Sequence, residues 1–449
     1  MKHRYYLSLL SFLLLSFAAA AQSVGVGTTA PAASAALDVT STTGGLLLPR
    51  MTSAQRAAIA TPAQGLFVFQ TDGTPGLYYY IGKSWLNVVN GMVPDASGYA
   101  GASPTSLVST LAGSGAAGAV DARPGTSAQF SSPAGVAVDA NGNVYVADAG
   151  NSCIRKILIS TGAVITLAGG VHGYSDGTGT NAQFANPTGV AVDNSGATVY
   201  VADRDNHNIR RIDVSTGVVT TLAGSTNGGA SSFGFADGLG TGALFYHPSG
   251  VAVDDRGTVY VADTDNNCIR MIVGSNVSTL AGIGRTGLNG PGYADGAVSV
   301  AKFTAPSGVA VDTRGTVYVA DPGNNCIRMI RGSNVTTLAG NVTAGYSDGT
   351  GTVAQFNVPY GVAVDNSGNV YVADRSNHCI RKIVVATGVA STLAGSGVAG
   401  FVNGSGAAAR FNGPSGVATY CGRSGQPNTS VIGDVYVADI DNHRIRVIK

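Results

Sequence analysis

Val144-Tyr-Val-Ala-Asp148 is the most informative stretch of this sequence, because the same five residues occur six times. The copies are centred on Tyr145, Tyr200, Tyr260, Tyr318, Tyr371 and Tyr436. Each copy follows a Phe-x-x-Pro-x-Gly-Val-Ala segment and precedes an Ile-Arg-x-Ile segment. A long unit that recurs in this way predicts a repeat architecture.

Each unit contains four short runs that are rich in β-branched and aromatic residues and bounded by Gly, Asn and Asp, as strands are. In the first unit the runs are Gly135–Asp139, Val144–Asp148, Ile154–Ile157 and Val164–Leu167. The first two are almost wholly apolar, which is typical of strands buried on both sheet faces. Six four-stranded antiparallel sheets of this kind predict an all-β fold, a six-bladed β-propeller.

The phase of the repeat predicts how the ring closes. Thr-Leu-Ala-Gly also occurs six times, but its first copy, at Thr110, precedes the first unit, and the last unit ends at Lys449 without one. The strand at Val108–Leu111 is therefore expected to complete the last blade, which removes two exposed sheet edges.

These motifs resemble the NHL-repeat family of β-propellers over roughly residues 107–449. The resemblance rests on Pro-x-Gly-Val-Ala-Val-Asp, Val-Tyr-Val-Ala-Asp-x-x-Asn and Ile-Arg-x-Ile. It implies the propeller fold, whereas the family's functions are mixed and include protein- and RNA-binding platforms, sensor domains and a few lyases. Function must therefore be argued from the site rather than from the fold.

The N-terminus predicts export. A basic start at Met1–Arg4, an apolar run at Leu7–Phe17 and a small-residue site at Ala18–Ala21 form a signal peptide over residues 1–21. The sequence contains no later apolar stretch long enough to span a bilayer. The mature protein is expected to be secreted or held at the outer cell surface.

Residues 22–90 show no trace of the repeat and are predicted to form a small β-rich segment. This segment resembles the fibre-like head that precedes diverse modules in secreted bacterial surface proteins, where such heads are often trimeric. The resemblance implies self-association. Residues 91–106 are rich in Gly, Ala, Ser and Pro, a linker composition, and residues 107–449 form the propeller.

Composition excludes some partners. Only 11% of the residues are charged and the net charge is +1, so no basic surface is available to neutralise nucleic-acid phosphates. Four cysteines share one repeat position and are expected to be buried thiols, because equivalent positions of neighbouring blades are too far apart for a disulfide: Cys153, Cys268, Cys326 and Cys379. Cys421 lies in an irregular insert of the last unit, and its role is open.

Residues present in every unit indicate architecture, since a catalytic group is needed only once. The aspartate that ends each Val-Tyr-Val-Ala-Asp segment is expected to cap its own turn together with the asparagine three residues later. The loops between the second and third strands vary, as do the connections that enter each blade, and they share one face of the propeller. Binding usually uses variable loops on a rigid scaffold.

Six long or aromatic residues of that loop face are candidates for ligand binding: Tyr174, Arg204, His207, Tyr346, Arg375 and His378. The alternative is that these loops only cover the surface. His207, His378 and His443 share a repeat position, but the second blade is not adjacent to the fifth and sixth, so no metal site is predicted.

Catalysis is tested through the lyases of the resembled family, which carry zinc-binding histidines directly after the proline of the first-strand motif. The matching residues contain no histidine: Ala134, Thr188, Ser249, Ser307, Tyr360 and Ser415. Glutamate, which lactonase-like metal cages use, is absent from the sequence. We therefore predict a non-enzymatic binding, adhesion or display module without a cofactor, whose partner is an extracellular protein, glycan or small molecule. The alternatives are a metal-dependent lyase or lactonase with an axial site, and a display protein without a ligand.

Overall fold

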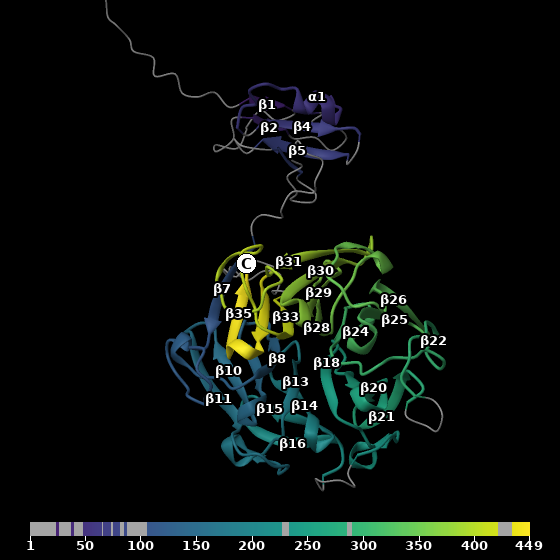
Figure 1. Ribbon diagram of the computed structural model, residues 1–449. Coiled ribbons are helices and arrows are strands. Elements are labelled where there is room, and N and C mark those ends of the chain that lie inside the picture. The colour runs from purple at the N-terminus through teal and green to yellow at the C-terminus, as the bar shows by residue number, and fades with distance from the viewer. Residues whose placement is uncertain are drawn as a thin grey trace, which may run out of the picture. The chain divides into compact units, whose positions relative to one another are not determined.

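The computed structural model describes residues 24–26, 37–39, 48–64, 66–72, 75–80, 85–87, 106–226, 233–284, 290–420 and 433–449 (Figure 1). The chain divides into two compact units, residues 1–104 and 105–449. The expected signal peptide, Cys421 and the linker up to residue 105 lie outside the described residues. Within the described part, no helix is long and apolar enough to cross a membrane.

The second unit is a β-propeller whose described residues form six antiparallel sheets. The first sheet contains β8 (Pro133–Val138), β9 (Val144–Asp148), β10 (Cys153–Leu158) and β11 (Ala163–Gly169). The second contains β12 (Gly177–Thr178), β13 (Pro187–Val192), β14 (Thr198–Asp203), β15 (Asn208–Asp213) and β16 (Val218–Gly224). The third contains β17 (Gly238–Leu239), β18 (Pro248–Val253), β19 (Val259–Asp263), β20 (Cys268–Val273) and β21 (Asn276–Ala281).

The remaining sheets repeat this order. The fourth contains β22 (Gly296–Ala297), β23 (Val309–Val311), β24 (Val317–Asp321), β25 (Cys326–Arg331) and β26 (Asn334–Gly340). The fifth contains β27 (Gly349–Thr350), β28 (Pro359–Val364), β29 (Asn369–Asp374), β30 (Cys379–Val384) and β31 (Val389–Ala394). The sixth contains β32 (Gly404–Ser405), β33 (Pro414–Thr419), β34 (Val435–Asp439), β35 (Arg444–Ile448) and β7 (Leu107–Ala112).

Ten short 3-10 helices occur in the connections of the described propeller. Six of them join the second and third strands of the blades: η2 (Ala149–Asn151), η4 (Arg204–Asn206), η6 (Thr264–Asn266), η7 (Pro322–Asn324), η9 (Arg375–Asn377) and η10 (Ile440–Asn442). The other four precede the first strand of a blade: η1 (Gly125–Ser127), η3 (Gly179–Asn181), η5 (Gly240–Gly242) and η8 (Gly351–Val353).

The sheets form a closed ring, with the innermost strands β8, β13, β18, β23, β28 and β33 in contact one after the next and β33 returning to β8 (Figure 1). β7 pairs with β35 in the last sheet, where Val108 lies opposite Ile448. The predicted all-β propeller and its closure by the N-terminal strand are confirmed. The first and last strands of the propeller are thus held within one sheet, and the outer edge of β35 is paired with β7.

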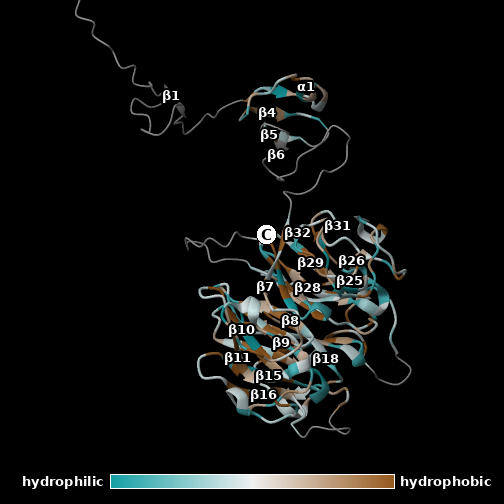
Figure 2. Ribbon diagram, turned by 60° about the vertical axis from the view of Figure 1, so that its left-hand side comes forward, coloured by the Kyte–Doolittle hydropathy of each residue, from teal (hydrophilic) through white to brown (hydrophobic). Residues whose placement is uncertain are grey.

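Apolar strand residues pack between neighbouring blades. Hydrophobic residues, brown in Figure 2, lie along the strands of the propeller. In one such cluster, Val251, Val259 and Val261 of the third blade pack against Ala202 and Ile209 of the second. Small and β-branched residues suit this position because the blades approach closely there.

A glycine in each innermost strand permits the closest approach between blades. A Cβ atom on any of these glycines would lie closer than 3.0 Å to a backbone carbonyl oxygen of the next blade: Gly135, Gly189, Gly250, Gly308, Gly361 and Gly416. The contacts run around the ring, and Gly416 of the last blade meets Ala134 of the first. The Gly-Val-Ala motif therefore reflects ring closure rather than a turn.

The repeated arginine is fully buried in every blade and binds the connection that enters its own blade. Arg328 Nη1 donates to Asp321 Oδ2 at 3.0 Å and Nη2 donates to Asp295 Oδ1 at 2.6 Å. The two groups also donate to the carbonyl oxygens of Lys302 and Ala294. In the last blade an asparagine, Asn403, takes the place of the outer aspartate.

The expected turn-capping role of the repeated aspartate is wrong. Asp321 makes no capping hydrogen bond to the 3-10 helix that follows it, and its Oδ1 accepts from the N–H of Thr304, seventeen residues upstream. Asn324 donates to Asp321 Oδ2 and to Gly292 O, so the asparagine also binds the incoming connection. Buried charge favours this arrangement because each carboxylate needs several strong donors.

The described cysteines of the repeat are free and buried, as predicted. Burial raises the pKa of the Cys268 thiol well above its usual value, and Asp263 adds to the effect. The thiols are therefore poor nucleophiles and fill space beside Ile-Arg-x-Ile.

The first unit contains a small mixed sheet of β3 (Arg50–Met51), β4 (Phe67–Gln70), β5 (Gly76–Tyr80) and β6 (Trp85–Asn87). Helix α1 (Ser53–Ala57) begins with a capping box between Thr52 and Gln55. A separate parallel pair joins β1 (Val24–Val26) and β2 (Leu37–Val39).

Candidate functional site

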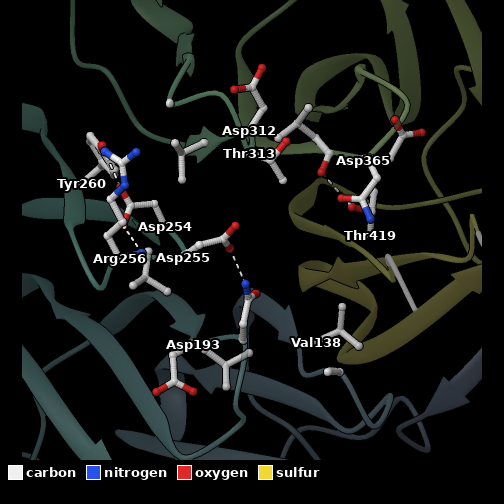
Figure 3. A pocket seen from close by; sticks show the side chains of 18 of the residues that line it. Val138, Asp193, Asp254, Asp255, Arg256, Tyr260, Asp312, Thr313, Asp365 and Thr419 are labelled. Atoms are coloured by element: carbon white, nitrogen blue, oxygen red, sulfur yellow. Dashed lines mark hydrogen bonds between the residues drawn. The ribbon is translucent and has the colours of Figure 1, made fainter. Parts of the chain in front are cut away.

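A large cavity of the propeller lies on its axis, at the end where the innermost strands turn into hairpins (Figure 3). Its volume is about 790 Å³, and every blade contributes to its wall through the residues that follow the innermost strand. A second cavity of about 60 Å³ lies at the opposite end of these strands and is lined by the Pro-x-Gly-Val segments. We call these the hairpin-face cavity and the loop-face pit.

Five blades place an aspartate of the repeat at the hairpin-face cavity. These carboxylates accept hydrogen bonds from their own hairpins. Asp254 Oδ1 accepts from the N–H groups of Arg256 and Thr258, and Oδ2 accepts from the Tyr260 hydroxyl at 3.2 Å. Burial, followed by the charge of Asp254, raises the pKa of Tyr260 to about 12. These aspartates therefore hold the turns. Four of them also accept a hydrogen bond from the tyrosine of their own Val-Tyr-Val-Ala-Asp segment: Asp139, Asp254, Asp312 and Asp365.

Three departures from the repeat shape the cavity. Asp255 is a second aspartate that points into the cavity and accepts a hydrogen bond from Asn194 of the preceding blade (Figure 3). Arg256 and Arg314 line it from two adjacent blades only. In the last blade Tyr420 replaces the repeated aspartate and is almost fully buried in the wall.

The six candidate residues do not include the lining of this cavity, because the sequence predicts binding on the opposite face and places an axial site only in the alternative of a metal-dependent enzyme. Two signals were present: the Asp254-Asp255 pair in the third unit, and Thr419-Tyr420 where the other units have Val-Asp. The Asp255–Asn194 contact itself joins residues of different blades and has no local signature.

The loop-face pit contains the positions that correspond to the lyase histidines. Two of their hydroxyls form hydrogen bonds between neighbouring blades. Thr188 Oγ1 donates to Ser249 O at 3.0 Å, and Ser307 Oγ donates to Tyr360 O at 2.7 Å. Within the described ranges, no group of three or more His, Cys or Asp side chains is placed to hold a metal ion.

His207 and His378, both predicted as ligand-binding residues, join neighbouring blades. Each follows a 3-10 helix with a left-handed backbone (φ 57° and 52°) and accepts an N–H of the next blade at Nδ1, from His247 and Gly413 respectively. Asn267 and Asn325 use their side-chain oxygens in the same way. His443 closes the series by accepting from Ser132 of the first blade. The shared property is an acceptor at an αL position, where Asn and His are tolerated.

His207 makes this contact sensitive to acid. Its side chain is 7% exposed, and burial, followed by the nearby His247, lowers its pKa to about 4. Because the unfolded chain takes up this proton near pH 6.5, the contribution of neutral His207 to stability is present above pH 6.5 and is lost as the pH falls towards 4.

We expect His207→Asn to unfold like the wild type at pH 7.5 but to be more stable at pH 4.5, by on the order of 1–2 kcal/mol. Asparagine keeps the acceptor and cannot be protonated. Urea unfolding at the two pH values measures the difference, with the exposed His172→Asn as control. An equal acid sensitivity of wild type and His207→Asn would contradict the proposed role of this imidazole.

The other predicted residues do not form one site. Arg204 pairs with Asp205 at 3.0 Å, near His207, whereas Arg375 lies over the Tyr360 ring at 5.2 Å. Tyr174 and Tyr346 are each 48% exposed on the connections of different blades. None of the six candidates lines either cavity, and their role in binding stays a prediction.

Comparisons with known proteins agree with this architecture. The family model of the NHL repeat matches residues 130–157, 184–212, 245–270, 303–328 and 356–383. The model of a phage tail like trimerisation region matches residues 25–105.

Curated relatives match through the repeats. NHL repeat-containing protein 2 of Gallus gallus is 31% identical over an alignment of 346 residues, and the match covers 58% of this chain and 47% of the relative. Protein SUPPRESSOR OF QUENCHING 1, chloroplastic, of Arabidopsis thaliana is 33% identical over 235 residues, which are 50% of this chain and 22% of the relative. The chain thus spans less than half the length of these relatives.

A solved structure of similar fold is the auxiliary nutrient binding protein of Bacteroides thetaiotaomicron. It aligns with a TM-score of 0.55 and 15% identity over 80% of this chain and 82% of that chain. At this identity the likeness shows the fold alone.

Proposed function

Because the chain carries NHL repeats folded as a β-propeller, preceded by a phage tail-like trimerisation region, we propose that it is an exported, non-enzymatic binding module. The hairpin-face cavity is its ligand site. Export rests on the N-terminal sequence, and intact-mass analysis of the exported protein should give a chain that begins at Gln22.

The observation that carries the proposal is the broken symmetry of this cavity. A scaffold made of repeats needs the same residues in every blade, and the turn-holding aspartates meet that need. Asp255, Arg256, Arg314 and Tyr420 do not follow the repeat, yet they gather in one concave space. Concave sites with a few polar groups that converge are where small ligands bind.

The charge of the lining indicates the class of ligand. Six aspartates line the cavity against two arginines: Asp139, Asp193, Asp254, Asp255, Asp312 and Asp365 against Arg256 and Arg314. The surplus of negative charge favours a ligand with a cationic group, and the arginines suit an accompanying carboxylate. Amines and zwitterionic amino acids are therefore the proposed ligands.

We expect a panel of amines and amino acids to contain a compound that raises the Tm of the full-length protein by several degrees in scanning fluorimetry. Asp255→Ala should raise the ligand concentration needed for the same shift at least tenfold, because it removes a carboxylate that points into the cavity and is not used to hold its own turn. Asp441→Asn, an exposed aspartate of the loop face, is the matched control.

Two results would contradict this proposal. A Tm shift that survives Asp255→Ala would place the ligand elsewhere. Zinc or calcium bound in stoichiometric amount to the purified protein would favour the metal-dependent lyase or lactonase over a binding module.

The first unit offers a surface for self-association, which the proposal includes. Val68, Tyr78 and Trp85 form its core on one side of the sheet. On the other side Phe67 is 44% exposed and stacks with Tyr79 at 5.4 Å between ring centroids. An exposed aromatic pair on a sheet face is suited to contact with a second copy of the chain.

Phe67→Asp should convert an associated full-length protein into monomers, because it places a charge within the aromatic pair. Light scattering coupled to size exclusion measures the mass, and Thr71→Asp, at an exposed neighbouring site, serves as control. A trimeric Phe67→Asp protein would show that association uses another surface, and a monomeric wild type would exclude association altogether.

A further inference from the structure

The aromatic residues that contact one another in the described propeller gather at one place on the loop face, between the second and third blades. Phe233, Tyr246, His207 and His247 form it. Tyr246 and His247 stand directly before the proline of the third unit. The corresponding pairs are Ser131-Ser132, Ala185-Asn186, Thr304-Ala305, Asn357-Val358 and Asn412-Gly413. The cluster is therefore not required by the scaffold.

The rings of the cluster are fixed in place. Phe233 stacks on Tyr246 with 4.4 Å between centroids and 20° between planes, and His207 meets both rings edge-on. The backbone N–H of Tyr246 donates to the buried Asp263, and that of His247 donates to His207. Phe233 is nevertheless 39% exposed, so the platform presents an aromatic surface to solvent.

Charged groups surround this platform and are already oriented. His247 Nδ1 lies 2.6 Å from Asp265 Oδ2, and its Nε2 lies 4.0 Å from Asp205 Oδ1. Arg204 Nη1 donates to the same oxygen of Asp205 at 3.0 Å. All four side chains are partly exposed, so the groups can exchange water for a ligand without rearrangement.

The chemistry of these groups selects a hydroxylated ligand. Carboxylates only accept hydrogen bonds and a guanidinium only donates them, whereas a hydroxyl group does both. A metal ion does not suit the cluster. His207 accepts a backbone N–H at Nδ1, so its neutral ring carries the proton on Nε2 and has no free lone pair. Among the described residues, no three His, Cys or Asp side chains are placed to hold a metal ion. A pyranose sugar matches these groups. The apolar face of its ring can stack on Phe233, and its hydroxyl groups can bond to Asp205, Arg204 and Asp265.

We propose that this cluster is a carbohydrate-binding site for a neutral pyranose. It is separate from the hairpin-face cavity, since none of its residues lines that cavity. It brings Arg204 and His207 into one site, Arg204 as a ligand contact and His207 as a positioning residue for His247.

Saturation-transfer NMR with methyl glycosides of glucose, galactose and mannose tests the site on the full-length protein. We expect transfer to the axial ring protons of at least one glycoside. Phe233→Ala should weaken its affinity by about tenfold through loss of the stacking surface, and Asp265→Asn should do so through loss of a charged acceptor.

Val342→Ala removes a similarly exposed apolar group from the same face and should leave binding unchanged. Asp255→Ala should also leave it unchanged, which separates this site from the cavity. Circular dichroism and thermal unfolding establish that each variant is folded. The proposal is overturned if no glycoside shows transfer, or if transfer survives both Phe233→Ala and Asp265→Asn in folded protein.

Discussion

Arg328→Met should lower the free energy of unfolding of the propeller by about 3–5 kcal/mol, because it leaves Asp321 buried without its counter-ion. The side chain of Arg328 is fully buried and donates to two carboxylates and two carbonyl oxygens. Burial already raises the pKa of Asp321 to about 6, despite its donors Asn324 and the Thr304 N–H. Urea unfolding followed by circular dichroism measures the loss.

The matched control is Arg331→Ala, an exposed arginine three residues further along the same strand, which should change stability by less than about 0.5 kcal/mol. Combining Arg328→Met with Asp321→Asn should recover part of the loss, since the uncompensated charge is removed. Equal losses in Arg328→Met and Arg331→Ala would show that the buried pair does not hold the incoming connection.

Gly250→Ala is expected to destabilise the propeller by at least about 2–3 kcal/mol or to prevent its folding, since the new methyl group collides with backbone. Its Cβ would lie closer than 3.0 Å to Ser307 O of the next blade, and neither innermost strand can move without disturbing its other neighbour. Soluble yield and thermal unfolding report the effect.

Gly242→Ala is the control, because a Cβ there meets nothing within 4 Å and the backbone is not left-handed. It should be neutral or slightly stabilising through the unfolded state. If Gly250→Ala unfolds at the same temperature as Gly242→Ala, the ring does not depend on close glycine contacts.

The sequence alone determined the propeller and the way it closes. Strand identity follows from short apolar runs such as Val144–Asp148, and the position of the odd strand follows from the early Thr-Leu-Ala-Gly copy at Thr110. These are local patterns, and repetition made each of them visible several times. The binding of β7 to β35 required no further information.

The roles of the repeated polar residues were only partly predictable. Asp321 was recognised as architectural, but its partners Arg328 and Thr304 lie on other segments, so a turn seemed sufficient. The sequence predicts His207 as a ligand-binding residue because it is one of the long or aromatic residues of the loop face. His and Asn alternate at that position because both accept a hydrogen bond from a backbone N–H of the next blade. Only the contact between His207 and the N–H of His247 reveals this role.

Only the tertiary structure decided where the concave surface lies. Asp255 and Asn194 belong to different blades, as do His207 and Tyr246, and both pairs are far apart in the sequence. The residue pattern within a unit specifies the strands and turns of a blade, because strand formation and hairpin turns depend on residues that are neighbours in the sequence. Residues that differ from the repeat come together only through the ring. Their meeting depends on the order of the blades around the axis and on the end of the strand at which each residue lies.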